Sequence, residues 1–208
     1  HLSEDKGEIN WVKSLFPECK NYLDVYERAG LLGKRSTFAH CLHLTEADWG
    51  ILQDAGCSVA FCPSSNLFLG SGLFDLPRLQ FANVKVGIGT DVGAGTSLSM
   101  LQTIADAYKT QRLAGNDLSP LSGLYMATLG GAQSLDCDAD IGNFKIGKEA
   151  DFTVLDPEST PLMSYRMQNC KSLEERLAVI VLLGDDRAIS ATYANGHCVH
   201  DRDIDEES

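Results

Sequence analysis

The chain has 208 residues, of which 44% are hydrophobic and 22% are charged, and its formal net charge is −12 at pH 7. This length and composition indicate a globular protein of one large domain, or of one and a half, with enough apolar side chains for a core. The acidic balance argues against nucleic acid or an anionic membrane as a partner, and no apolar run reaches the roughly 18 residues that a membrane-spanning helix needs.

Helices and short apolar strands alternate along residues 1–135 in an order that is typical of an α/β fold. We expect helices over 7–15, 22–29, 45–54, 76–81, 99–113 and 119–129, and buried strands over 36–41, 57–62 and 84–90. The second strand is expected to be broken by Pro63 and by a polar loop over residues 64–66. Strands separated by helices pair in parallel through helical crossovers, so these residues are expected to form one α/β unit.

Residues 136–208 are predicted to form a smaller, β-rich unit. We expect a strand over 150–155, a loop holding Pro157 and Pro161, a helix over 172–183, and strands over 191–194 and 198–200. Asn195-Gly196 lies between the last two strands and is a strong signal for a two-residue hairpin turn. Residues 201–208 carry much of the acidity and are expected to form a solvated tail.

The cysteines favour a reduced protein. They are Cys19, Cys41, Cys57, Cys62, Cys137, Cys170 and Cys198. Their number is odd, their spacing is irregular and no CxxC pair exists, which argues against both a disulfide framework and a thiolate zinc site. Most lie among apolar residues and are predicted to be buried thiols, so a cytoplasmic location is expected.

Metal-binding side chains stand where predicted parallel strands end: His40, Asp91 and, if a strand precedes it, His1. Ligands of α/β folds collect at the carboxyl ends of the strands, so these side chains are expected on one rim. Glu4 follows His1 by three residues, and its carboxylate can move protons beside an ion that the imidazole binds. Alone, His1 could be a chain end, His40 a core residue and Asp91 a helix cap. Their common rim favours a metal site.

Other polar residues are assigned ordinary roles. Gly93-Ala94-Gly95 lacks the lysine of a phosphate-binding loop and does not fit GxGxxG, so nucleotide binding by that route is rejected. His43 follows His40 by three residues and is expected in the outgoing loop rather than on a metal. His197 and His200 are expected at the surface of the terminal hairpin.

Short motifs occur in order along nearly the whole chain. They are His1-x-x-Glu4, Asn21-Tyr22-x-x-Val25-Tyr26, Ala39-His40-Cys41, Cys62-Pro63-Ser64-Ser65-Asn66, Gly89-Thr90-Asp91, Ala127-Thr128-Leu129-Gly130-Gly131, Ile141-Gly142-Asn143-Phe144-x-x-Gly147-Lys148-Glu149 and Leu183-Gly184-Asp185-Asp186-Arg187. This set resembles the metal-dependent deaminases of the amidohydrolase superfamily, and among them the guanine deaminases.

The resemblance implies an α/β fold in which residues 1–135 form the second half of a (β/α)8 TIM-type barrel, with strands five to eight. Residues 136–208 would form a small β-sandwich domain with a bridging helix and the acidic tail. The resemblance also implies zinc, or iron, bound by His1, His40 and Asp91. Glu4 and Asp91 would be catalytic, and Glu4, His40 and Asp91 would contact the substrate.

The implied activity is hydrolytic deamination of guanine to xanthine and ammonia by a zinc-activated water, in purine catabolism or salvage. The implied partners are a small purine and, at full length, a second copy in a homodimer. The family's His-x-His pair and purine-binding arginine would precede His1, so the chain is expected to need a missing N-terminal half. Phe61 stands where the family usually has His. Two alternatives stay open: an aminohydrolase or chlorohydrolase acting on another aromatic ring, or a non-catalytic fragment.

Overall fold

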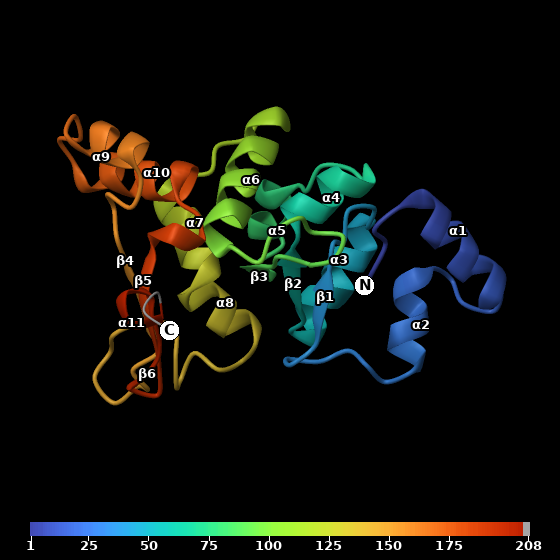
Figure 1. The fold of residues 1–208 in the computed structure, drawn as a ribbon. Helices are drawn as coiled ribbons and strands as arrows, with labels where there is room; N and C mark the ends of the chain where they lie inside the picture. Colours follow the sequence, from blue (N-terminus) through green and yellow to red (C-terminus); the bar gives the residue numbers. More distant parts are fainter. Residues whose placement is uncertain (206–208) are drawn as a thin grey trace.

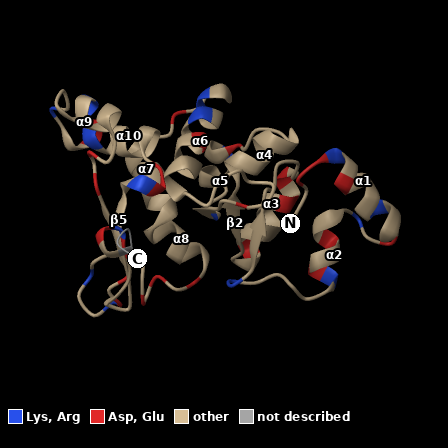
Figure 2. Cartoon of the chain, in the orientation of Figure 1, with Lys and Arg blue, Asp and Glu red and all other residues tan. Residues whose placement is uncertain are grey.

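The computed structural model describes residues 1–205 of the chain, and its strands form two three-stranded sheets (Figure 1). One sheet is parallel and the other is antiparallel, which confirms the predicted α/β class. In Figure 2 the Lys and Arg residues are spread over separate helices and loops among the acidic ones, in keeping with the net charge of −12. No helix in the described range is long and apolar enough to span a membrane.

The parallel sheet has the spatial order β1-β2-β3, with strands β1 (Thr37–Ala39), β2 (Ser58–Phe61) and β3 (Lys85–Ile88). The strands are shorter than predicted, but their parallel pairing is as predicted. Leu2 extends the sheet beyond β1. Its N–H donates to the carbonyl of Ala39 at 3.2 Å, and it forms a parallel bridge with His40. The first residues of the chain therefore lie beside the residue that follows β1.

The helices are α1 (Lys6–Leu15), α2 (Tyr22–Arg28), α3 (Glu46–Ala55), α4 (Pro63–Leu69), α5 (Leu76–Phe81), α6 (Met100–Leu113), α7 (Pro120–Ala127), α8 (Leu129–Ser134), α9 (Pro161–Met167), α10 (Leu173–Leu183) and α11 (Arg202–Asp205), with a 3-10 turn η1 (Asp186–Ala188). Helix α3 begins as predicted, because Thr45 and Asp48 form a reciprocal capping box. The single helix expected over 119–129 is interrupted at Thr128, whose φ of −125° and ψ of −102° are not helical.

Two predicted loops are wrong because both begin helices. Pro63 opens α4 in its first turn, where a missing N–H costs nothing and the fixed φ is already helical. The polar side chains of residues 64–66 are buried rather than solvated, so their polarity was a misleading signal. Pro161 opens α9 in the same way, and Thr160 caps that helix by accepting from the N–H of Met163 at 3.2 Å.

The antiparallel sheet consists of β4 (Phe152–Leu155), β5 (Ile189–Ala194) and β6 (His197–Asp201), in that order. The predicted hairpin is confirmed, and its turn residues Asn195 and Gly196 have φ of 48° and 75°, as a two-residue turn of this kind requires. The prediction of a solvated tail is wrong for its first part. Asp201 belongs to β6, and Arg202 forms an ion pair with Asp156 at 3.1 Å. Residues 206–208 lie outside the described range.

Two clusters of buried apolar side chains hold these elements together. The larger surrounds the parallel sheet and includes Phe38, Val59 and Phe61. The smaller joins Leu101 of α6 to Met163 of α9 and to side chains of α10. Helices α9 and α10, which lie between β4 and β5 in the chain, therefore pack on the α/β part through a shared apolar contact.

Close packing between α6 and α7 depends on Gly123. A Cβ atom at this position would lie 2.3 Å from Cγ2 of Ile104, whereas a Cβ at Gly50 in α3 would meet no heavy atom within 4 Å. We predict that Gly123→Ala destabilises the protein by about 1–3 kcal/mol through overpacking. Gly50→Ala should stabilise it by about 0.5–1 kcal/mol, because alanine loses less entropy in a helix. Denaturant unfolding of both variants measures the difference, and equal shifts would contradict the close contact.

Candidate active site

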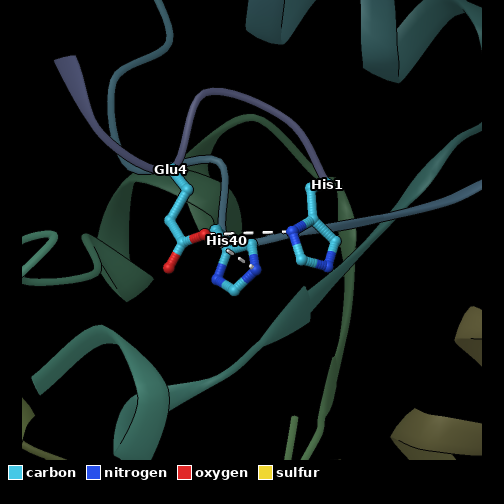
Figure 3. A group of neighbouring side chains, drawn as sticks. All are labelled: His1, Glu4 and His40. Carbon is cyan, nitrogen blue, oxygen red and sulfur yellow. Dashed lines mark ion pairs between the residues drawn. The ribbon is translucent and has the colours of Figure 1, made fainter. Parts of the chain in front are cut away.

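Four titratable side chains meet at the carboxyl ends of the parallel strands. His1 and Glu4 precede α1, His40 follows β1, and Asp91 follows β3. Oε2 of Glu4 lies 3.6 Å from Nε2 of His40 and 3.8 Å from Nδ1 of His1, and Oδ2 of Asp91 lies 3.8 Å from Nε2 of His40. Figure 3 shows the rings of His1 and His40 and the carboxylate of Glu4 directed toward one another. The structure thus brings together the side chains that were expected on one rim.

The group runs from the protein interior to its surface. The side chain of His40 is 0% exposed and that of Glu4 is 9% exposed, whereas those of Asp91 and His1 are 22% and 61% exposed. A small molecule could therefore approach from the side of His1 and Asp91, while His40 and Glu4 form the inner wall.

Several backbone positions around the group are left-handed although none is glycine: Ser3, His40, Cys41 and Asp91, with φ of 50°, 72°, 54° and 50°. Such conformations cost on the order of 1–3 kcal/mol each and persist where surrounding structure enforces them, often at functional sites. Asp91 does not cap a helix, since Ser99 caps α6. The loop after Asp91 is tightly closed, because a Cβ at Gly95 would lie 1.6 Å from the carbonyl oxygen of Thr90.

The donor atoms suit a divalent metal ion. Ligand atoms of His1, Glu4 and His40 lie within 4.8 Å of one another, as do those of His40, Cys62 and Asp91. Nε2 of His40 is fully buried and has no hydrogen-bond partner among the described residues. An unsatisfied buried nitrogen is costly, and a cation between the imidazoles and carboxylates would satisfy it. Imidazole and carboxylate ligands fit zinc and also iron.

Further polar residues hold Glu4. Oγ of Ser71 donates to Oε1 of Glu4 at 3.0 Å. The N–H of Glu4 donates to Oε2 of Glu8 at 2.8 Å, and the hydroxyl of Tyr22 donates to Oε1 of Glu8 at 2.9 Å. Burial, with hydrogen bonds to Tyr26 and Glu8, raises the pKa of Tyr22, so it remains a neutral donor. The sequence did not predict Ser71, Glu8 or Tyr22 as residues that support the site. The pattern Asp5-x-x-Glu8, which is typical of helix starts, could have indicated Glu8.

Residues assigned ordinary roles lie apart from the central group. Nε2 of His43 lies 3.1 Å from the carbonyl oxygen of Ser71 in the outgoing loop. His197 is exposed on β6. Phe61, which stands where the family usually has His, is buried and stacks on Phe74 with ring centroids 4.3 Å apart. Its side chain therefore belongs to the core.

Comparison with known proteins identifies the family. The amidohydrolase family profile matches residues 1–199, so the chain belongs to the amidohydrolase family. It is 54% identical to the guanine deaminase of Escherichia coli (strain K12) over 97% of its own length and 46% of that protein's. The chain thus spans about half the length of the curated relatives that it matches.

Solved structures agree with this assignment. The chain matches E. coli guanine deaminase with a TM-score of 0.95, covering 97% of this chain and 47% of the other. It matches a guanine deaminase from C. acetobutylicum, with bound guanine in the active site, at a TM-score of 0.84 and 30% identity, covering 96% and 48%. An adenosine deaminase from Xanthomonas campestris with bound zinc matches at 0.80 and 28% identity, covering 95% and 44%.

The thiols of Cys41 and Cys62, beside His40, should be unreactive in the folded protein. Burial raises the pKa of Cys41, and burial together with the negative charge of Asp91 raises the pKa of Cys62 to about 12. Thiolate is the reactive form, so iodoacetamide should label exposed Cys198 much faster than buried Cys62 in the folded protein. Peptide mass spectrometry measures the labelling. Equal rates at Cys62 and Cys198 in folded protein would show that the site is open.

Proposed function

We propose that the protein deaminates guanine hydrolytically, consuming water and releasing xanthine and ammonia, in purine catabolism or salvage. The observation that carries this proposal is the convergence of His1, Glu4, His40 and Asp91 at the strand ends. The similarity to guanine deaminases over nearly the whole chain supports guanine as the substrate.

We propose His1, His40 and Asp91 as ligands of one divalent ion, with zinc the first candidate and iron the second. The unsatisfied Nε2 of His40 and the zinc in the Xanthomonas campestris relative support this assignment. When bound, such an ion would lower the pKa of a water molecule toward neutrality and so supply the nucleophile for hydrolysis.

Glu4 and Asp91 would move the protons of the reaction. Asp91 would accept a proton from the attacking water, and Glu4 would protonate N3 of the purine. The proton held by Asp91 would then pass through Glu4 to the leaving amine. Oε1 of Glu4 is occupied by the hydroxyl of Ser71, which leaves Oε2 toward His1 and His40 as the proton-carrying oxygen. Glu4, His40 and Asp91 would form the wall that contacts the purine ring.

For the architecture, we propose that residues 1–135 form the second half of a (β/α)8 barrel and that residues 136–208 contribute to a β-sandwich. The adjacent parallel strands and the extension by Leu2 support this arrangement. A cleft of about 610 Å³ beside β3, lined by Val84, Val86 and Met126 among others, would accommodate a further element of such a barrel. A cytoplasmic homodimer is proposed from the resemblance to guanine deaminases.

The first test is the reaction itself. At its full natural length, the protein should convert guanine to xanthine, and a chelator should abolish turnover until zinc is added back. Xanthine absorbance and a coupled ammonia assay measure both products. Turnover of adenosine without turnover of guanine would instead favour an aminohydrolase of another substrate class.

The second test addresses Glu4. Glu4→Gln removes the proton carrier but keeps the side-chain shape, so kcat should fall by a factor of roughly 10² to 10⁴. The metal content should remain that of the wild type, because Glu4 is not a proposed ligand. Glu18→Gln, at an exposed position, is the matched control. Unchanged kcat in Glu4→Gln would remove this residue from the mechanism.

A further inference from the structure

Helix α4 and the turn after it carry an unusual number of buried polar side chains. Ser64, Ser65 and Asn66 are 7%, 0% and 2% exposed, and Ser71 is 8% exposed. Their partners differ. Asn66 and Ser71 bind His40 and Glu4, and Ser64 binds Thr96 in the loop after Asp91, at 2.9 Å between the hydroxyl oxygens. This segment therefore contacts Glu4, His40 and the loop that follows Asp91.

The contact between Asn66 and His40 defines how the ring is protonated. Oδ1 of Asn66 lies 2.9 Å from Nδ1 of His40. An amide oxygen only accepts, so the proton of the neutral imidazole stands on Nδ1 and the lone pair on Nε2. In the opposite tautomer, an N–H on Nε2 would face carboxylate oxygens at 3.6 and 3.8 Å, beyond hydrogen-bond reach, within a fully buried environment.

Nδ2 of Asn66 has no hydrogen-bond partner among the described residues. The amide is therefore held by its oxygen, through the imidazole, and by packing. An aspartate at this position would keep the accepting oxygen and lose no existing hydrogen bond. This asymmetry makes Asn66→Asp a conservative variant for the contact with His40.

Ser71 acts on Glu4 in a comparable way. Its hydroxyl occupies Oε1 of Glu4 at 3.0 Å, and its own carbonyl lies 3.1 Å from Nε2 of His43. Rotation of the Glu4 carboxylate would break the hydrogen bond from Ser71. Oε2 is consequently kept toward His1 and His40.

We propose that Asn66 and Ser71 are positioning residues: Asn66 holds His40 with a free lone pair on Nε2, and Ser71 directs Oε2 of Glu4 into the site. The catalytic consequence rests on the proposed function, whereas the tautomer of His40 does not. A neutral tautomer with its lone pair free is the form that binds a metal ion.

Ser65 provides a matched control within the same helix. It is fully buried, but its hydroxyl donates to the carbonyl of Cys62 at 3.2 Å, one turn back in the chain, and not to a site residue. If Ser71 contributed only the packing of its hydroxyl, Ser65→Ala and Ser71→Ala should lower kcat to a similar extent. If Ser71 positions Glu4, Ser71→Ala should lower kcat much more than Ser65→Ala does.

The tautomer is measured by nitrogen-15 NMR of the histidine rings in the metal-free protein at its full natural length. His40 should carry its proton on Nδ1 in the wild type and in Asn66→Asp, and lose that preference in Asn66→Ala. Zinc affinity, from competition with a chelator, should fall by about 10- to 100-fold in Asn66→Ala and stay unchanged in Ser65→Ala. A wild-type proton on Nε2, or equal affinities in the two alanine variants, would overturn the role of Asn66.

Turnover tests Ser71. Ser71→Ala should lower kcat by about 10- to 100-fold, the usual range for a hydrogen bond to a charged group, with KM little changed. Ser71→Thr, which keeps the hydroxyl, should recover most of it. A loss no larger than that of Ser65→Ala would overturn the role of Ser71. If the wild type holds the Nδ1 proton but does not consume guanine, the proposed function fails and the assignment of Asn66 stands.

Discussion

The arrangement of the candidate site depends on the pairing of Leu2 with the end of β1. The N–H of Leu2 donates to Ala39, and its carbonyl accepts from the N–H of Cys41 at 2.9 Å. Leu2 is fully buried, so this pairing is held by core packing as well as by hydrogen bonds. Because successive residues of a strand face opposite sides, a slip of one residue would move His1 to the other face. The register therefore determines which side chains meet His40.

A second constraint is the cost of keeping ionisable groups inside the protein. The carboxylates of Glu4 and Asp91 both lie within 4 Å of Nε2 of the buried imidazole of His40, at 3.6 and 3.8 Å. Buried charge is unfavourable unless partners compensate it, and the described neighbours do so only in part: Ser71 and Asn66 each satisfy one atom, while Nε2 of His40 is left without a partner. A positive ion at the centre is the simplest way to complete this balance.

The sequence was sufficient for the outline of the fold and for the central residues. Apolar runs broken by glycine and proline located the parallel strands, and the rule that ligands gather at strand ends brought His1, His40 and Asp91 to one place. The supporting residues could not be found this way. Ser71 is separated from Glu4 by 67 positions and Asn66 from His40 by 26, and no local periodicity encodes such contacts. They depend on how α4 packs, which is a tertiary property.

Helix α4 was predicted as a loop because its first turn is rich in polar residues, and those same residues give the helix its inferred role at the site. Ser64, Ser65 and Asn66 favour loops in solution because their side chains compete for backbone hydrogen bonds. In the folded chain the polar atoms of Ser64 and Asn66 are turned instead toward other elements, and Pro63 with Gly70 sets the two ends of the helix. A buried helix rich in polar residues is poorly consistent with local propensity. Such conflicts are expected where side chains are retained for function rather than for stability. The disagreement between local pattern and observed structure is thus itself an argument that α4 serves the site.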